Sequence, residues 1–121
     1  MPLGAGSFIS CSNFNAPSDK AVKDAISLEM NSNTPRDWCS VVSYEYYVDR
    51  ITSVEIEERG NFNKKGEYWP IKAWVHGICY EESLPAPGKA QSVQEIHFGG
   101  KGDFHIFKDD YGKWKSKLVS H

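Results

Sequence analysis

The chain has 121 residues, of which 40% are hydrophobic and 13% aromatic, which is enough for one compact domain with its own core. The formal net charge is -2, and the basic residues do not gather into one patch, which argues against nucleic-acid binding. The sequence has no apolar run of about 18 residues, so no membrane-spanning helix is predicted.

Residues 1–18 are rich in Gly, Ser, Asn and Pro and lack helical periodicity, so we expect an irregular arm followed by a single domain at residues 19–121. Within the arm, Phe8-Ile9-Ser10-Cys11 resembles the end of a bacterial lipoprotein signal, but it lacks a positive region and its apolar stretch is short and broken by glycine. Two locations stay open: the cytoplasm, or the cell envelope if Cys11 is lipidated or the chain is exported.

A helix is predicted to begin after Ser18, which is a suitable N-cap, with Asp19 in an acidic first turn. Apolar residues recur at positions 21, 25 and 28 and at positions 22, 26 and 30, which indicates one apolar helical face. The run Asn31–Pro35 favours turns and should end this helix. Residues 36–49 are ambiguous, and their pattern fits a short helix at 38–42 followed by an extended piece at 44–48.

The second half of the chain predicts two successive antiparallel hairpins. The first joins strands at Ile51–Phe62 and Tyr68–Tyr80 through a turn at Asn63–Glu67. Gly60 suggests a bend, and Pro70, which has no N–H, suggests an edge position or a bulge near the start of its strand.

The last predicted hairpin joins Phe104–Lys108 and Lys113–Val119 through a tight turn at residues 109–112. The segment Ser92–Phe107 is either one long strand with a kink at Gly99–Gly102 or two strands joined by a turn there.

The two faces of the Tyr68–Tyr80 segment are both largely apolar. One face carries Trp69, Ile71, Ala73, Val75, Gly77 and Cys79; the other carries Tyr68, Lys72, Trp74, His76, Ile78 and Tyr80. If the helix covers the Trp69 face, the second face is left bare, and bare apolar patches usually mark an interface. We therefore predict a symmetric homodimer through Tyr68, Trp74, Ile78 and Tyr80.

Several pieces of the chain together resemble a known fold family: Val54-Glu55-Ile56 through Gly60, Tyr68-Trp69-Pro70-Ile71-Lys72, Gly77-Ile78-Cys79, and Lys108 through Trp114. They resemble uncharacterised small bacterial proteins with a cystatin-like fold, the roll shared with nuclear transport factor 2 and ketosteroid isomerase. The resemblance covers about Asp19 to Val119. It implies an α+β roll, with an N-terminal helix packed on a curved antiparallel sheet of four or more strands. It also implies a cone-shaped cavity and frequent dimerisation, but it carries no catalytic residue across.

Enzymes of that superfamily often use a carboxylate or a His–Asp pair in the cone. The candidates for such a role here are His97, His105 and Asp103, with His76, Asp49 and Glu55 as further members of the set. The plainer interpretation is that the histidines are half-exposed residues of a sheet face. His76, His97 and His105 could also form a zinc site if they share one sheet face, but their spacing is not diagnostic, and we predict no metal and no cofactor.

Aromatic residues offer a different kind of site. Trp38, Tyr44, Tyr47 and Trp69 are predicted to line a cavity for a small apolar ligand, since such pockets are mainly apolar with a few polar groups. Ordinary core packing is the alternative. Of the three cysteines, none form a Cys-x-x-Cys pair; Cys39 and Cys79 are either a disulfide, if the protein is exported, or two free buried thiols.

The sequence thus favours a non-catalytic, dimerising module that binds a small apolar ligand or a protein partner. One alternative is a small isomerase-like or dehydratase-like enzyme that uses a cavity carboxylate or histidine. Another is an interaction module anchored to the envelope, which depends on Cys11.

Overall fold

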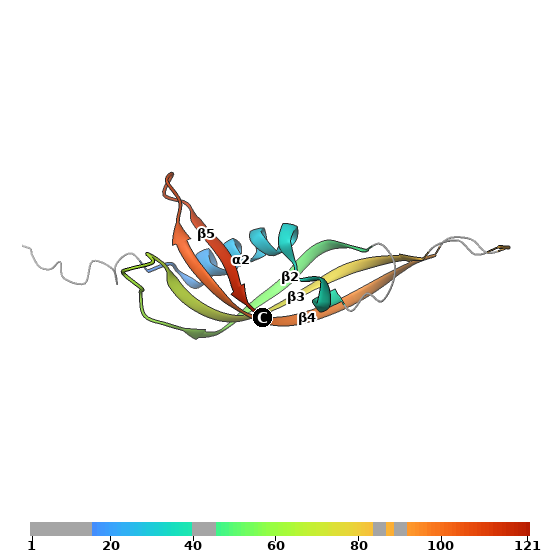
Figure 1. The fold of residues 1–121 in the computed structure, drawn as a ribbon, viewed down its shortest axis with the longest axis horizontal. Helices are drawn as coiled ribbons and strands as arrows, with labels where there is room; N and C mark the ends of the chain where they lie inside the picture. Colours follow the sequence, from blue (N-terminus) through green and yellow to red (C-terminus); the bar gives the residue numbers. More distant parts are fainter. Residues whose placement is uncertain (1–15, 40–45, 84–86, 89–91) are drawn as a thin grey trace, which may run out of the picture.

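A computed structural model of the chain describes residues 16–39, 46–83, 87–88 and 92–121. The helices are α2 (Asp19–Asn33) and the 3-10 helix η1 (Arg36–Cys39), and the strands are β2 (Tyr46–Arg59), β3 (Trp69–Ser83), β4 (Ser92–Lys108) and β5 (Trp114–Ser120). The strands form one antiparallel sheet in the order β2-β3-β4-β5 (Figure 1). The predicted α+β arrangement, one helix followed by a curved four-stranded sheet, is confirmed.

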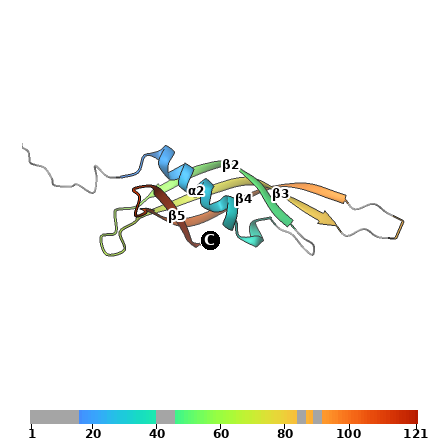
Figure 2. The ribbon, with the colours of Figure 1, turned by 90° about the horizontal axis from the view of Figure 1, so that it is seen from above.

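Helix α2 lies across one face of the sheet (Figure 2). Both views show β3 and β4 running well past the end of α2 as a long two-stranded arm (Figures 1 and 2). No helix in the described part of the chain is long and apolar enough to cross a membrane.

The start and end of α2 follow the prediction. The Ser18 hydroxyl accepts a hydrogen bond from the Ala21 amide at 3.1 Å, and the helix ends at Asn33, before Pro35. The buried residues are Val22, Ala25, Ile26 and Met30. The prediction was wrong for Leu28, whose exposed fraction is 59%. At about 100° per residue, Leu28 lies about 200° around the helix from both Ile26 and Met30, so it points away from the sheet.

The main core fills the space between α2 and the sheet. Three buried helix residues pack against six buried strand residues, and together these are Val22, Ile26, Met30, Val54, Ile71, Ala73, Val75, Phe104 and Ile106. The β3 residues in this set belong to the predicted Trp69 face, so that face does meet the helix. No buried side chain in the described part is polar or charged, so burial of apolar area is the main source of stability in this core.

The hairpin predictions hold with shifted bounds. The first turn is closed by a bridge between Asn63 and Tyr68, but β2 ends at Arg59 rather than Phe62 and begins at Tyr46 rather than Ile51. The strand ends where Gly60 meets Pro70, since a Cβ on Gly60 would lie 2.5 Å from the Pro70 Cγ. Glycine is therefore the residue that this close approach allows.

Pro70 does not mark an edge strand, because β3 lies between β2 and β4. The last pair of the β2–β3 ladder joins Arg59 and Ile71, and the Gly60 amide donates to the Pro70 oxygen at 2.8 Å. In an antiparallel strand the N–H and C=O of one residue point the same way. The N–H that Pro70 lacks would therefore face Gly60, just past the last regular pair of the β2–β3 ladder and near the start of β3, where proline is tolerated.

Strand β4 is one continuous strand from Ser92 to Lys108, so Gly99–Gly102 is not a turn. Gly100 instead gives room for η1, because a Cβ at this position would lie 2.1 Å from the Trp38 Cδ2. The short helix predicted at 38–42 is η1 at Arg36–Cys39, and residues 40–45 lie outside the described part. Cys39 and Cys79 are free thiols, and both are buried.

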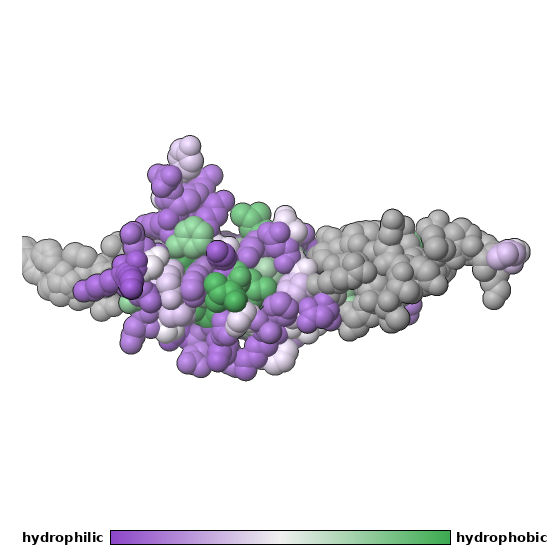
Figure 3. Space-filling model, in the orientation of Figure 1, coloured by the Kyte–Doolittle hydropathy of each residue, from purple (hydrophilic) through white to green (hydrophobic). Residues whose placement is uncertain are grey.

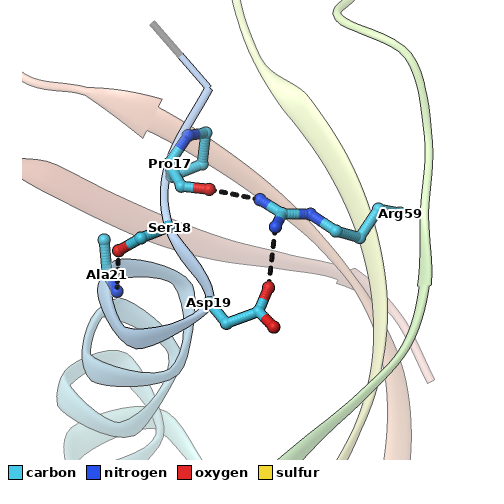
Figure 4. A network of polar contacts seen from close by, with 5 residues as sticks. All are labelled: Pro17, Ser18, Asp19, Ala21 and Arg59. Atoms are coloured by element: carbon cyan, nitrogen blue, oxygen red, sulfur yellow. Dashed lines mark hydrogen bonds and ion pairs between the residues drawn. The ribbon is translucent and has the colours of Figure 1, made fainter. Parts of the chain in front are cut away.

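Polar contacts hold α2 to the two edge strands of the sheet, β2 and β5. Arg59 of β2 donates to the Asp19 carboxylate at 2.7 Å and to the backbone oxygen of Pro17 (Figure 4). At the other side, the Glu29 carboxylate accepts from the Ser116 hydroxyl at 2.9 Å and from the Leu118 amide at 2.8 Å. The second of these bonds satisfies a backbone donor on an edge strand, which would otherwise be open to pairing with another chain.

Large apolar residues that remain exposed come from different elements of the described chain. They are Leu28 on α2, Trp74 on β3, Val93 on β4, Tyr111 in the last turn and Val119 on β5. The view in Figure 3 shows a mostly hydrophilic surface around a small hydrophobic patch. Scattered exposure of this kind is ordinary for a protein surface.

Candidate functional site

An aromatic pocket lies where the β2–β3 and β4–β5 hairpins end side by side. Its volume is about 260 Å³, and its lining residues are Phe62, Glu67, Trp69, Phe107, Lys108 and Trp114. Trp69 begins β3 and pairs with Ile106 of β4, while Trp114 begins β5 and pairs with Lys108. Trp69 and Trp114 also pack on the main core, so the pocket continues the core outward at the end of the sheet.

The aromatic rings of the pocket are held by contacts with one another and with a cation. The Phe62 and Trp69 rings have centroids 5.1 Å apart at an angle of 50°, which is a favourable tilted arrangement. The Lys108 ammonium lies 5.0 Å from the Trp114 ring centroid, within the range of a cation–π contact. Both tryptophans keep part of their surface accessible, so aromatic area is available to a ligand.

Two tight turns bring the polar lining residues to the pocket. In the first turn the Asn63 side chain accepts from the Gly66 amide at 2.7 Å, and Glu67 follows with a φ of 58°, which is uncommon for a residue other than glycine. In the second turn the Asp109 carboxylate accepts from the Lys113 amide at 2.9 Å and the Tyr111 amide at 2.8 Å. These hydrogen bonds, with that from Lys113 foremost, lower the pKa of Asp109.

Of the four residues predicted to bind a ligand, the structure places only Trp69 in this pocket. Trp38 lies on the same side of the sheet but elsewhere, with its ring 6.5 Å from Phe98 and 5.8 Å from His121 between centroids. Tyr44 and the side chain of Tyr47 lie outside the described residues. Trp38 and Trp69, the two described members of this set, therefore do not line the same pocket.

The sequence analysis missed Phe62 and Trp114 as pocket residues. Trp114 begins β5 one residue after the Asp109–Gly112 turn. A residue at the start of a strand can have one side in the core and the other at the open end of the sheet. Its position at the start of a strand was therefore the sequence feature that could have identified Trp114 as a pocket residue.

The second candidate region is the outer face, which we define as the sheet face opposite α2. Around Trp74, the Glu57 carboxylate accepts from the indole Nε1 at 3.1 Å and lies 2.5 Å from the Lys101 ammonium. The Lys101 hydrogen bond lowers the pKa of Glu57. The Lys101 ammonium is 5.9 Å from the Trp74 ring centroid, and the His76 ring is stacked at 6.4 Å.

The four residues predicted as an interface are therefore not a bare apolar patch. Trp74 is 38% exposed and Ile78 only 4%. Tyr68 stacks on His105, with ring centroids 3.5 Å apart, and the Tyr80 hydroxyl donates to Glu95 at 3.3 Å. The outer face combines these aromatic rings with charged neighbours, and the homodimer stays a prediction.

Asp103 and His105, two of the residues considered for catalysis, lie together on the outer face. They line a hollow of about 270 Å³ with Lys72 and Pro70 among its other residues. Asp103 accepts from the Ser120 hydroxyl at 2.8 Å and lies 4.0 Å from the Lys72 ammonium. Burial, followed by the charge of Lys117, lowers the pKa of His105.

The third candidate, His97, is not part of this hollow. It lies eight residues from His105 along β4, a run of about 26 Å of strand, and its exposed side chain is 2.9 Å from Glu95. His76, on β3, is paired instead with Glu55 at 3.3 Å. The three histidines of the possible zinc site thus contact different carboxylates or rings. None of them lies between α2 and the sheet, the place that the cone-shaped cavity of the resemblance implies.

Comparison of the chain with protein families, with curated proteins and with solved structures finds no match.

Proposed function

We propose that the protein is a non-catalytic binding module whose aromatic pocket holds a small planar apolar ligand. The observation that carries the proposal is the pairing of two half-buried tryptophans, Trp69 and Trp114, from separate hairpins around a hollow of about 260 Å³. Ligand sites are mainly apolar and aromatic, with a few polar groups that fix orientation. Lys108 and Glu67 are the two charged residues of this lining.

The size of the pocket limits the ligand. Pockets for drug-sized molecules occupy about 300–1,000 Å³, so this one suits a molecule of one or two fused rings. A planar ligand can stack on an indole face, and an anionic group on it can pair with the Lys108 ammonium. We therefore expect a planar aromatic carboxylate to bind better than an aliphatic carboxylate of similar volume.

Indole-3-acetate is a suitable probe, and NMR of the tryptophan side chains provides the readout. The chain has four tryptophans, so its four indole N–H signals report on separate places. We expect the Trp69 and Trp114 signals to move on titration and those of Trp38 and Trp74 to stay. Trp114→Ala should remove binding, and Trp74→Ala, on the opposite face, should retain it. A titration that moves none of the signals, or moves all four equally, would contradict the proposal.

A dimer through the outer face belongs to the same proposal. Trp74 supports it, because a 38% exposed indole in the middle of a sheet face is a common kind of interface anchor. Light scattering on a sizing column should give twice the chain mass for the native protein and the single-chain mass for Trp74→Glu. A native protein with the mass of one chain would contradict the dimer and leave the pocket proposal standing.

The alternative function is a small enzyme that uses the hollow of Asp103 and His105. What favours it is the position of a carboxylate and an imidazole, Asp103 and His105, in one hollow of about 270 Å³, since these are groups that general acid–base catalysis uses. A ligand that moves the His105 ring signals and leaves the Trp114 indole signal in place would favour this alternative over the aromatic pocket.

A further inference from the structure

A second, smaller core cluster contains both cysteines of the described part of the chain. Its buried residues are Cys39, Cys79 and Phe98, with Trp38, Ile51 and Ile96 packed against them. Cys39 ends η1 and Cys79 lies on β3, and the exposed fraction of each is 0%. The two cysteines thus lie in one small buried cluster, and the neighbouring Cys79 side chain contributes to the raised pKa of the Cys39 thiol.

The packing around η1 holds the two thiols together. Trp38, the residue before Cys39, lies directly on Gly100 of β4, where a Cβ would come within 2.1 Å of the indole. On β3, Gly77 makes room for the Phe98 ring in the same way, because a Cβ on Gly77 would lie 2.6 Å from the Phe98 Cζ. The position of Cys39 over β3 is therefore determined by close packing on two glycines and not by the short turn alone.

Both cysteines of the pair are free thiols. Burial, with the hydrogen bond to Cys79, raises the pKa of Cys39 to about 12, so this thiol stays protonated at neutral pH. A protonated, buried thiol reacts slowly with reagents from solvent. Its neighbour Cys79 is the group that can reach it without passing through solvent.

We propose that Cys39 and Cys79 are a redox-active pair that closes into an intramolecular disulfide and ties η1 covalently to β3. With oxidised glutathione as the oxidant, one cysteine attacks its disulfide and releases one glutathione thiol. The second cysteine then attacks the mixed disulfide and releases the other. Two S–H bonds are lost and one protein S–S bond forms, while the glutathione disulfide takes up the two electrons and two protons. The first attack requires η1 to lift, because both thiols are buried.

The disulfide would close a loop that contains the whole of β2 (Tyr46–Arg59). A cross-link over about 40 residues restricts the unfolded chain more than the folded one. Because the thiols are already neighbours in the folded protein, the oxidised form should be the more stable one. By linkage, the same difference makes the disulfide form more readily in the folded protein than in the unfolded chain.

The experiment is a thiol–disulfide titration of a Cys11→Ser protein, in which Cys39 and Cys79 are the remaining thiols. Mixtures of reduced and oxidised dithiothreitol set the redox poise, and alkylation after acid quenching, followed by mass spectrometry, counts free thiols. We expect the equilibrium constant for the disulfide to be at least about tenfold larger in buffer than in concentrated urea. The melting temperature should be higher for the oxidised form.

The controls separate this pair from other thiol chemistry. Cys39→Ala and Cys79→Ala should each abolish the intramolecular bridge. Peptide mapping of the oxidised native chain should show a Cys39–Cys79 bridge, and bridges of Cys11 in its place would overturn the proposal. An equilibrium constant that is equal or smaller in buffer than in urea, or a lower melting temperature on oxidation, would also overturn it.

Discussion

On the face of the sheet that α2 covers, Val75, Phe104 and Ile106 are fully buried. On the outer face of the same strands, the side chains of Lys72, His76 and Lys101 are 40%, 41% and 42% exposed. The inner face therefore gains its stability from burial of apolar area, and the outer face from pairs of rings and charges that water screens. Alternate residues of one strand therefore serve different purposes: the inner face should determine the stability of the fold, while the outer face should tolerate substitution.

The largest difference is expected between Phe104→Ala and Trp74→Ala. Phe104 is the largest fully buried side chain among the described residues, and its removal should lower the free energy of unfolding by about 3–5 kcal/mol because it leaves a cavity. Trp74→Ala should cost much less, because the indole is 38% exposed. Urea denaturation measures the free energy of unfolding of both variants. Similar losses would show that the outer face contributes as much to stability as the inner face.

Gly99 and Gly100 provide a matched pair, because they are neighbours on β4 and point to opposite faces. A Cβ on Gly100 would come within 2.1 Å of the buried side of Trp38, whereas on Gly99 the nearest atom is the His76 Nδ1 at 3.1 Å. We expect Gly100→Ala to destabilise the protein by about 1–3 kcal/mol through overpacking. Gly99→Ala should be close to neutral, because the His76 ring can move aside and alanine lowers the entropy of the unfolded chain. Thermal unfolding of the two variants would distinguish them.

Substitution of Glu29 tests how much its hydrogen bonds to β5 contribute to stability. Glu29→Ala removes the acceptor for the Ser116 hydroxyl and the Leu118 amide, and we expect a loss of about 1–2 kcal/mol. Glu55→Ala is the control, since Glu55 is an exposed carboxylate whose partner is His76 on the outer face. Hydrogen exchange at the Leu118 amide should speed up in the first variant only; equal exchange rates in both would argue that Glu29 does not protect this edge.

The smallest expected effect is a pH dependence from His105. Its pKa is lower in the folded protein, mainly through burial, so the unfolded chain binds a proton more readily in the window below the ordinary pKa of about 6.5. The contribution of His105 to stability is therefore present above about pH 6.5 and is lost as the pH falls. His105→Gln should flatten this part of the stability profile, measured by urea denaturation at several pH values. An unchanged slope would show that other groups cause this part of the pH dependence.

Local chemistry was enough to predict the elements that depend on neighbouring residues. Ser18 caps α2 and the Asn31–Pro35 run ends it, since both effects act within a few residues. The turns at Asn63–Glu67 and Asp109–Gly112 follow from asparagine, aspartate and glycine in the same way. Strict alternation along Tyr68–Tyr80 separated the face that meets α2 from the outer face, because side chains in a strand alternate whatever packs on them.

Tertiary packing decided what the sequence left open. Whether Gly99–Gly102 was a turn or a strand depended on Trp38, more than sixty residues away, which fills the space over Gly100. Leu28 faces solvent because α2 has the sheet on one side only, and Pro70 sits in a central strand because β2 ends beside it. Trp69 and Trp114 share a pocket, and Cys39 touches Cys79, only because the sheet brings distant hairpins and turns together. These contacts cannot be predicted from spacing along the chain, because they depend on how the elements pack around a common core.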